Sequence, residues 1–510
     1  MTITLDKQTV PAVGGEATAQ GEIQNGRHMT GLPLESGFCL SLWLQTVRSN
    51  PLLNHRTTEE LPKEAEVVII GSGISGSLCA LSLLQNPDPP KSVVILEARE
   101  LCSGATGRNA GHCKPDQWRG FTKYQKRHNS EQALKVCRSL MDIGWTLADL
   151  CKILKNEQDT WKSMAAYVKR HNVQCDFWIG KTLDVCMTDE VAETAAKTFS
   201  DYFEAGGDVS RIEVTMGSKE AEEISRLKGA RAVYAWDAST LHPWKLVAHI
   251  VKQALDLGLN LQTWTPATSI SGSAHNWTVH TDRGSITTSK VVHTTNAYAG
   301  FLLPEVKSAI HPTPHMCDKV IPPTSYSGTN SLQNSYAVIY PTGLYSINPR
   351  LNADGAVLFG GSAPNQQRLL DYVAEDPENR ETDDSLINFE PVTEAVRKLG
   401  REGFEWDFPK GAKGTEARYD YSWSGIIGRS ADDVPFIGAV PDKPGQWMSC
   451  GHNGHGMARI FTAAPALAKM VQGATWAEAG LPECFEITKE RLERLEKLCT
   501  QDLNVAINGV

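Results

Sequence analysis

The stretch EVVIIGSGISGSLCALSLLQ, residues 66–85, decides the fold. Its β-branched run from Val67 to Ile70 predicts a buried parallel strand, and an apolar helical pattern starts a few residues later. Between them stand three glycines at the G-x-G-x-x-G spacing, Gly71, Gly73 and Gly76. A second apolar run, SVVILEA at residues 92–98, predicts the next strand and brings Glu97 to its end. This order predicts a Rossmann-type unit that binds a dinucleotide.

Each part of this fingerprint has a chemical reason. Gly71 allows a tight turn, Gly73 lets the backbone approach a pyrophosphate, and Gly76 lets the helix pack closely on the strand. The free N–H groups of the first helical turn, which includes Ile74 and Ser75, favour an anion. Glu97 is expected to accept hydrogen bonds from a ribose. A bare G-x-G-x-x-G is weak evidence and coincidence is the alternative, but the surrounding strands and helix favour a dinucleotide.

A late glycine-rich stretch separates FAD from NAD. GHNGHGM, Gly451 to Met457, lies between a predicted strand and a predicted Ala-rich helix. A simple NAD dehydrogenase does not need a second backbone-exposing loop so far along the chain. A long FAD does, because N–H donors at another helix N-terminus stabilise negative charge on the reduced flavin. FAD is therefore the expected cofactor.

Composition limits the partners. The 510 residues are too many for one core, so two domains are expected. A net charge of -9 argues against nucleic acid, which favours a basic surface. No apolar run approaches the roughly 20 residues of a membrane span, and no secretory signal is evident. We expect a cytoplasmic protein without a membrane partner, with its 12 cysteines mostly reduced.

Five motifs occur together in family order: EVVIIGSGISG, VVILEARELCSGATGRNAGH, TTNAYAG, WSGIIGRSADDVPFIG and GHNGHGM. With them the chain resembles FAD-dependent oxidoreductases of the D-amino-acid oxidase/glycine oxidase (DAO) superfamily. It is most similar to the γ-glutamylputrescine oxidase-like branch, and its N-terminal LLNHRTTEELPKEAEVVIIGSG resembles fungal members. The resemblance covers roughly residues 40–475, with the middle third matched only loosely.

The resemblance implies an α/β fold in which a Rossmann-like FAD-binding domain interleaves with a mixed or antiparallel-sheet substrate domain. The expected FAD-binding domain is discontinuous and comprises residues 63–157, 228–300 and 422–473. The expected substrate-binding domain comprises residues 158–227 and 301–421. The remaining segments are expected to be a disordered tail (1–37), an N-terminal arm (38–62) and a C-terminal helix (474–510).

The resemblance also implies a cofactor site larger than the fingerprint. Besides the glycines, Ile74, Ser75 and Glu97, its expected members are Ala98, Arg99, Ser103, Gly104, Ala105, Thr106, Arg108, Asn109, Gly111, His112, Thr295, Asn296, Gly425, Gly454, His455, Gly456 and Met457. In this view Arg108 binds the flavin or pairs with a substrate carboxylate. His455 is expected beside the cofactor.

The catalytic candidates are His112, Tyr345 and Trp423, each with a structural alternative as a core residue or a hydrogen-bonding group. A metal site formed by Cys102, His112 and Cys113 is disfavoured, because the spacing matches no regular zinc pattern and a fourth ligand is not evident. No metal is expected. FAD is expected to bind non-covalently, although a covalent link through His112 or Cys113 is an alternative.

The implied reaction moves hydride from a C–H next to an amine nitrogen to the flavin N5. It gives an imine and, with O2 as electron acceptor, hydrogen peroxide. The partner is then a small-molecule amine. One alternative is a flavin-dependent tailoring oxidase or dehydrogenase of a fungal specialised metabolite. Another is a flavoprotein without catalytic activity, which the intact flavin-edge loops disfavour.

Overall fold

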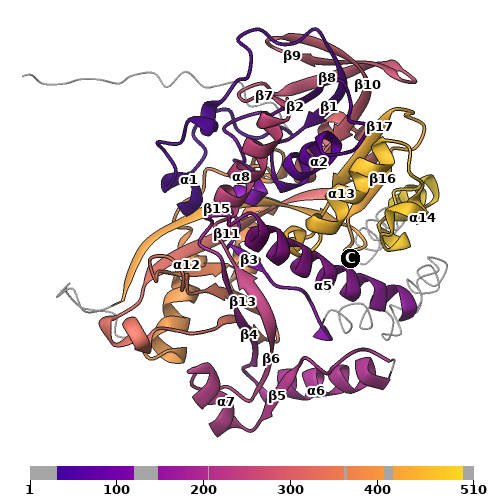
Figure 1. Cartoon of the computed structure of the whole chain (residues 1–510). Coiled ribbons are helices and arrows are strands. Elements are labelled where there is room, and N and C mark those ends of the chain that lie inside the picture. The colour runs from indigo at the N-terminus through magenta and orange to yellow at the C-terminus, as the bar shows by residue number, and fades with distance from the viewer. Residues whose placement is uncertain (1–30, 120–146, 205, 361–364, 407–416, 498–510) are drawn as a thin grey trace, which may run out of the picture.

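The computed structural model describes residues 31–119, 147–204, 206–360, 365–406 and 417–497. In this part of the chain two β-sheets lie at opposite ends of the molecule, with helices between and around them (Figure 1). One sheet has a parallel centre and the other is mixed. The predicted α/β fold, a Rossmann-like half joined to a mixed-sheet half, is confirmed.

The first sheet contains the predicted Rossmann unit. Its parallel strands follow the order β17-β10-β1-β2-β7, with bounds β1 (Glu64–Ile70), β2 (Val93–Leu96), β7 (Asn260–Gln262), β10 (Gly284–His293) and β17 (Gln446–Cys450). Three antiparallel strands extend it, β8 (Ala267–Ser273), β9 (Asn276–Thr281) and β16 (Phe436–Ala439). The helices α2 (Ile74–Leu84), α8 (Pro243–Asp256) and α13 (Ile460–Val471) pack along it. Because Val67, Val68 and Ile69 are fully buried, β1 is the central strand that the apolar run predicts.

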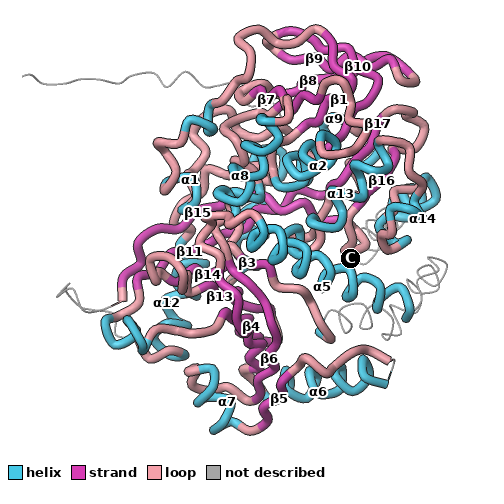
Figure 2. Tube along the Cα trace, viewed as in Figure 1, coloured by secondary structure: helices cyan, strands magenta, loops and turns pink. Residues whose placement is uncertain are grey.

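The second sheet follows the order β15-β11-β14-β13-β12-β4-β6-β3, and β5 pairs with β6 at its edge. Its strands are β3 (His112–Cys113), β4 (Trp178–Cys186), β5 (Glu213–Met216), β6 (Ala232–Thr240), β11 (Ile310–Ile321), β12 (Ser335–Tyr340), β13 (Gly343–Asn348), β14 (Val357–Gly360) and β15 (Arg418–Ser430). All of these pairs are antiparallel except β12 with β4. The long β11–β15 pair runs toward the first sheet (Figure 2).

The other helices surround these sheets. They are α1 (Leu42–Gln45), α5 (Leu147–Arg170), α6 (Asp189–Glu204), α7 (Ser218–Ser225), α9 (Ala299–Leu302), α10 (Gln366–Ala374), α11 (Pro377–Arg380), α12 (Glu390–Lys398) and α14 (Trp476–Ala479). Short helical turns matter at three loops, η2 (Ala105–Gly107), η3 (Asn296–Tyr298) and η8 (Gly456–Ala458). Within the described ranges, no helix combines the length and apolar character that a bilayer crossing requires.

Strand pairing differs from the predicted domain bounds at three places. Strands β3, β6 and β15 were expected wholly or mostly in the FAD-binding domain, yet all three pair in the second sheet. A strand pattern does not say which sheet a strand joins, so only the pairing distinguishes them. The division into two domains otherwise stays a prediction.

The N-terminal arm begins earlier than predicted. Residues 31–37 were assigned to the disordered tail, but Leu32 and Pro33 line the central cavity. After them, Leu42, Trp43 and Leu44 of α1 are buried in the main core. Residues 1–30 of the predicted tail and 498–510 of the predicted C-terminal helix lie outside the described residues.

Candidate active site

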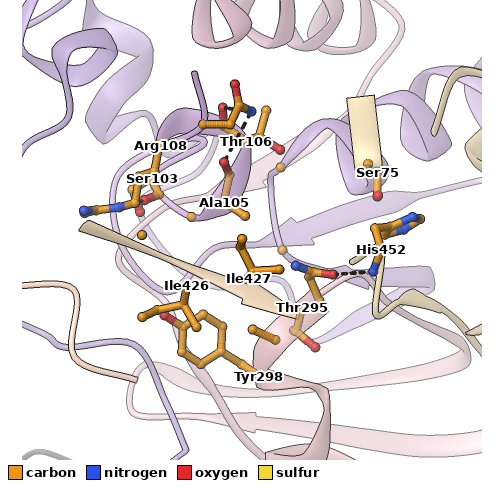
Figure 3. Close-up of a pocket in the computed structure, with 18 of the residues that line it drawn as sticks. Ser75, Ser103, Ala105, Thr106, Arg108, Thr295, Tyr298, Ile426, Ile427 and His452 are labelled. Carbon is orange, nitrogen blue, oxygen red and sulfur yellow. Dashed lines mark hydrogen bonds between the residues drawn. The ribbon is translucent and has the colours of Figure 1, made fainter. Parts of the chain in front are cut away.

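A cavity of about 370 Å³ lies between the two sheets and is lined by residues of both. The carboxyl ends of β1 and β2 and the segment after β10 form one side, which is where ligands bind in open parallel sheets. The loop 103–112, strands β11 and β15, and the η8–α13 segment form the rest. Figure 3 shows side chains from both halves of the molecule facing this space.

The first glycine loop has the geometry that its spacing predicts. Gly71 has φ +108°, and a Cβ there would lie 2.9 Å from the Thr294 carbonyl oxygen. A Cβ on Gly76 would lie 2.0 Å from the Gly71 oxygen, so glycine is required where helix meets strand. Gly76 therefore serves packing and does not itself line the cavity, whereas Gly71, Gly73, Ile74 and Ser75 do.

Glu97 lies buried at the end of β2 and lines the cavity. One carboxylate oxygen, Oε2, accepts hydrogen bonds from Ser72 N at 2.9 Å and Ser72 Oγ at 2.6 Å. The other, Oε1, accepts from Arg99 N at 3.0 Å. A carboxylate offers about four acceptor positions, so one remains for a ligand hydroxyl. Ser72, which the prediction omitted, orients this carboxylate.

The segment after β2 wraps closely around its own turn. Residues 103–106, Ala98, Arg99, Asn109 and His112 all line the cavity. A Cβ on Gly107 would lie 2.1 Å from the Cys102 oxygen, which explains the glycine at this position. Asn109 Oδ1 accepts from Gly111 N at 2.7 Å and holds the next turn. Gly111 itself faces away, because its Cβ position meets the Leu241 oxygen at 2.6 Å.

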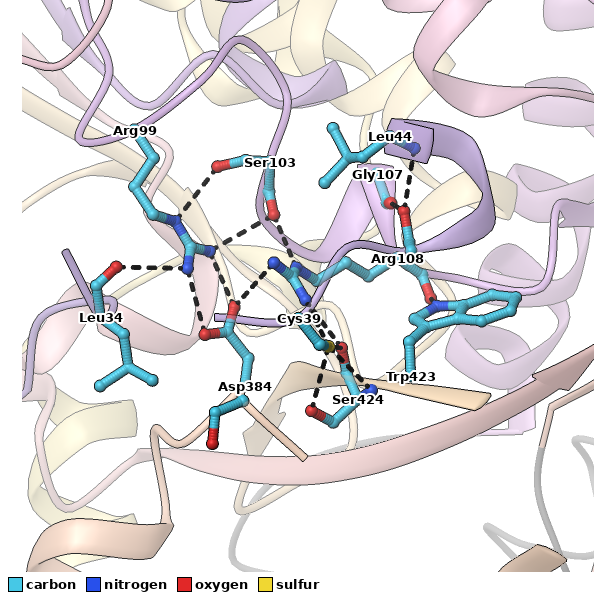
Figure 4. A network of polar contacts seen from close by, with 12 residues as sticks. Leu34, Cys39, Leu44, Arg99, Ser103, Gly107, Arg108, Asp384, Trp423 and Ser424 are labelled. Atoms are coloured by element: carbon cyan, nitrogen blue, oxygen red, sulfur yellow. Dashed lines mark hydrogen bonds and ion pairs between the residues drawn. The ribbon is translucent and has the colours of Figure 1, made fainter. Parts of the chain in front are cut away.

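Arg108 was predicted to contact flavin or a substrate carboxylate, and its contacts do not support a role as a carboxylate ligand. Its guanidinium is 1% exposed and lies 3.2 Å from Asp384 Oδ2. It also donates to the Ser103 carbonyl at 2.8 Å and the Ser424 carbonyl at 2.9 Å. Arg108 borders the cavity, but its polar atoms point into the protein (Figure 4).

His112 lies in the opposite situation on the same loop. Its Nδ1 is 3.0 Å from Ser346 Oγ on β13, while its buried Nε2 has no hydrogen-bond partner among the described residues. Burial, together with the nearby Lys114 charge, lowers the pKa of His112 to about 3. The ring is therefore neutral at physiological pH. Its neighbours along the cavity wall include Cys317, Leu344, Ser346 and Gly360.

The late glycine loop is held by Asn296. This residue has φ +50°, and its Oδ1 accepts from Gly451 N at 3.0 Å and His452 N at 3.2 Å. Gly454, with φ +75°, Gly456 and Met457 then line the cavity just before α13. Thr295, Asn296 and Gly425 line it as well.

The two histidines of this loop differ from expectation. His455 does not line the cavity, and its Nε2 lies 3.9 Å from Asp116 Oδ2. His452, which the prediction omitted, does line it. Its Nε2 is 3.2 Å from Ser449 Oγ, and its buried Nδ1 has no partner in the described part of the chain. Asn453, with φ +55°, reverses the chain between the two rings.

Tyr345 and Trp423 do not line the cavity, so their positions do not support the predicted catalytic roles. Tyr345 is buried in the core of the second sheet, where its Oη donates to the Ala395 carbonyl at 3.2 Å. Trp423 is fully buried and donates from Nε1 to the Arg108 carbonyl at 2.8 Å. Both are the core aromatics of the alternative interpretation.

The cysteines of the loop are also structural. Cys102 is fully buried and outside the cavity lining, and Cys113 donates from Sγ to the Met457 carbonyl at 3.2 Å. Burial raises the pKa of the Cys113 thiol, which opposes nucleophilic chemistry. This placement does not support a covalent link through Cys113. A link through His112 stays a prediction.

A different group brings three possible metal ligands together, with one atom of each within 4.8 Å of the others: Asp116, Glu157 and His455. Two arginine guanidinium groups already lie against the carboxylates of this group. Arg459 Nε donates to Glu157 at 3.0 Å, and Arg119 lies 3.6 Å from Asp116. Because these two cations would compete with a metal ion, we interpret the cluster as an ion-pair network.

These features fit FAD. The glycines at the β1–α2 turn leave backbone N–H groups at a helix N-terminus for a pyrophosphate. Glu97 keeps an acceptor position for a ribose. Buried polar atoms without hydrogen-bond partners among the described residues belong to four residues that line the cavity: Arg108 Nη2, His112 Nε2, Thr295 Oγ1 and His452 Nδ1. Of these, Arg108 Nη2 is ion-paired with Asp384 at 3.2 Å. Such atoms are costly unless a ligand satisfies them.

Comparison with known proteins gives the same assignment. The family model described as DAO, FAD dependent oxidoreductase, matches residues 66–472. The probable oxidoreductase OrdL of Haemophilus influenzae is 21% identical over 423 residues, 81% of this chain and 84% of that protein. The γ-glutamylputrescine oxidoreductase of Escherichia coli is 23% identical over 419 residues, 80% of this chain and 84% of that protein.

Solved structures share the fold. L-proline dehydrogenase from P. horikoshii superposes with a TM-score of 0.60 at 17% identity, over 83% of this chain and 98% of that one. Glycine oxidase from Geobacillus kaustophilus gives 0.58 at 18% identity, over 84% and 99%. Because the family model spans the glycine loops, the cavity and both sheets, this chain belongs to the DAO family of FAD-dependent oxidoreductases.

Proposed function

We propose that this chain is an FAD-dependent oxidase of a small amine, which loses a hydride from a carbon next to its nitrogen and a proton from the nitrogen, and so becomes an imine. Bound FAD would supply the hydride acceptor at N5, and O2 would take up the two electrons together with two protons as hydrogen peroxide. The names of the relatives support an amino substrate, since they include a γ-glutamylputrescine oxidoreductase and a glycine oxidase.

The residues that would hold FAD come from both glycine loops. We assign the pyrophosphate to the first turn of α2 and the ribose to Glu97. We assign the flavin end to the loop 103–109, Thr295, Asn296, His452 and the Gly454–Met457 turn, which border the same cavity. Binding is proposed to be non-covalent, so acid precipitation should release the flavin into the supernatant.

His112 carries the proposal for the substrate. We place the ring proton on Nδ1, which then donates to Ser346 Oγ, so that Nε2 presents a lone pair to the cavity. This lone pair would accept a hydrogen bond from the substrate N–H and fix the position of the neighbouring C–H. Because the ring is neutral, it does not repel an amine. Orientation of this kind removes a large part of the barrier.

Arg108 has no part in this binding mode. Its guanidinium is committed to Asp384 and to two backbone carbonyls. We therefore propose that the amine is held mainly through its nitrogen.

The test is an anaerobic titration of the purified yellow protein with an amine panel. The panel contains γ-glutamylputrescine, sarcosine, D-amino acids and cyclic secondary amines. We expect one of them to bleach the visible flavin absorbance, and readmitted O2 to restore it with formation of hydrogen peroxide. If dithionite reduces the flavin but no amine does, the amine oxidase assignment is wrong, and a tailoring enzyme acting on a different carbon skeleton takes its place.

A further inference from the structure

A buried ion-pair cluster adjoins the cofactor cavity and is centred on Asp384, in the segment between α11 and α12. Asp384 is 1% exposed. Its Oδ1 accepts from Arg99 Nη1 at 3.1 Å, and its Oδ2 accepts from Arg99 Nη2 at 2.8 Å. The same Oδ2 lies 3.2 Å from Arg108 Nη2. Figure 4 shows this single carboxylate between the two guanidinium groups.

Both arginines shape the loop that borders the cavity. The Ser103 carbonyl accepts from Arg99 Nη2 at 3.3 Å and from Arg108 Nε at 2.8 Å. Arg99 Nε also donates to Ser103 Oγ at 3.2 Å. Residues 103–106 and both arginines line the cavity. The position of the carboxylate therefore determines the conformation of the loop proposed to contact FAD.

Asp384 also attaches the N-terminal arm. Its backbone carbonyl accepts from Cys39 N at 2.9 Å, and the Phe38 ring lies over the Arg99 guanidinium at 4.5 Å. Further along the arm, Ser41 Oγ donates to the Gly107 carbonyl at 2.5 Å and Trp43 Nε1 to the Asn109 carbonyl at 2.6 Å. The arm thus lies along the loop from residue 99 to residue 109.

We propose that Asp384 is a positioning residue for the cofactor: it holds Arg99 and Arg108 together, fixes the loop 103–109 against FAD and seats the N-terminal arm over that loop. Without the carboxylate, two buried cations would face each other unpaired, which is strongly unfavourable. The loop would then move to separate or hydrate them. This inference rests on the proposed FAD contacts of the loop and not on the identity of the substrate.

The test compares two buried acids that each form a two-point ion pair with an arginine. Asp384→Asn removes the charge beside the cavity. Asp432→Asn removes a matched pair, Asp432 with Arg491, whose side chains are both 5% exposed and do not line the cavity. Release of FAD from diluted holoenzyme, followed by flavin fluorescence, gives the dissociation constant. Asp384→Asn should raise it about tenfold or more. Asp432→Asn should change it by less than about twofold, although both variants lose thermal stability.

Conservative and mild variants complete the test. Asp384→Glu keeps the charge and should restore part of the FAD affinity. Phe38→Ala leaves no buried charge unpaired, so it should fold even if Asp384→Asn does not. It should speed FAD release about threefold. Equal FAD affinity in wild type and Asp384→Asn would overturn the proposal, as would an equal loss in Asp432→Asn or unchanged release in Phe38→Ala. The readout is flavin binding, so a failed amine panel would leave this result intact.

Discussion

Arg108 and His112 lie four residues apart on one loop and border the same cavity, yet their polar atoms are in opposite states. Arg108 donates hydrogen bonds to two backbone carbonyls, and its Nη2, which has no hydrogen-bond partner among the described residues, is ion-paired with the buried Asp384 carboxylate at 3.2 Å. His112 is bonded at one ring nitrogen and, within the described residues, unpartnered at the other. The difference shows that charge alone is a poor guide to ligand contact. A buried polar atom that lacks both a hydrogen-bond partner and a neighbouring opposite charge is the better guide.

The largest effect is expected from Arg108→Ala. This change leaves the buried Asp384 with one cation and removes the hydrogen bonds from the guanidinium to two backbone carbonyls. The free energy of unfolding should therefore fall by about 3–5 kcal/mol. Urea denaturation of the holoenzyme measures this loss. A variant that folds like wild type but has a higher KM for carboxylate-bearing amines would instead make Arg108 a substrate ligand.

Gly425→Ala perturbs Arg108 without touching His112. The added Cβ would lie 2.9 Å from Arg108 Cβ, so the side chain must shift within a packed environment. We expect a loss of about 1–3 kcal/mol in stability, visible as a lower melting temperature and lower FAD content. Unchanged stability combined with slower flavin reduction would contradict the structural role of Arg108.

His112→Asn should have the converse profile. Removing the Nε2 acceptor should slow anaerobic flavin reduction by the best amine about tenfold to a hundredfold. FAD affinity should stay within about twofold, since the ring is assigned to the substrate, and the stability loss should be about 1 kcal/mol. Stopped-flow absorbance and urea denaturation separate the two effects. Loss of FAD rather than of rate would assign His112 to the cofactor.

The lowered pKa of His112 should be visible in how the free energy of unfolding changes with pH. Its pKa in the folded protein is lowered to about 3 by burial, below the ordinary value of 6.5. Below pH 6.5 the His112 ring binds a proton in the unfolded chain but not in the folded protein, so the free energy of unfolding falls as the pH falls. Between pH 7 and pH 5, wild type should lose about 2 kcal/mol more than His112→Asn. A constant difference between the two proteins would show that the folded ring titrates normally.

The smallest effect is expected from Tyr345→Phe. This change removes one hydrogen bond to the Ala395 carbonyl, in a core away from the cavity. Stability should fall by about 1 kcal/mol at most, and the rate of flavin reduction should not change. A slower reduction step would return Tyr345 to the list of catalytic candidates.

The sequence predicts features that depend on neighbouring residues. Gly76 satisfies a local requirement, because its Cβ position is blocked by the nearby Gly71 oxygen, and Gly71 has the positive φ of a tight turn. The spacing of these glycines therefore predicts the turn. The late glycine loop follows the same logic, with positive φ at Gly451 and Gly454.

Features that depend on distant contacts escape such reasoning. Asp384 forms an ion pair with Arg99 across 285 residues of sequence. No residue near Arg99 or Arg108 in the sequence therefore indicates that both arginines pair with a buried carboxylate. The choice between His452 and His455 depends on the turn at Asn453, not on residue type. Ser346, the partner of His112, comes from the middle of the chain, where the family resemblance is loosest.

The most direct test is the anaerobic reduction of the flavin by the best amine in wild type and in His112→Asn, each with FAD fully bound. We expect rapid bleaching in wild type and a rate at least about tenfold lower in the variant, with the same flavin spectrum before the amine is added. Equal rates in the two proteins would contradict the claim that the open nitrogen of His112 positions the substrate.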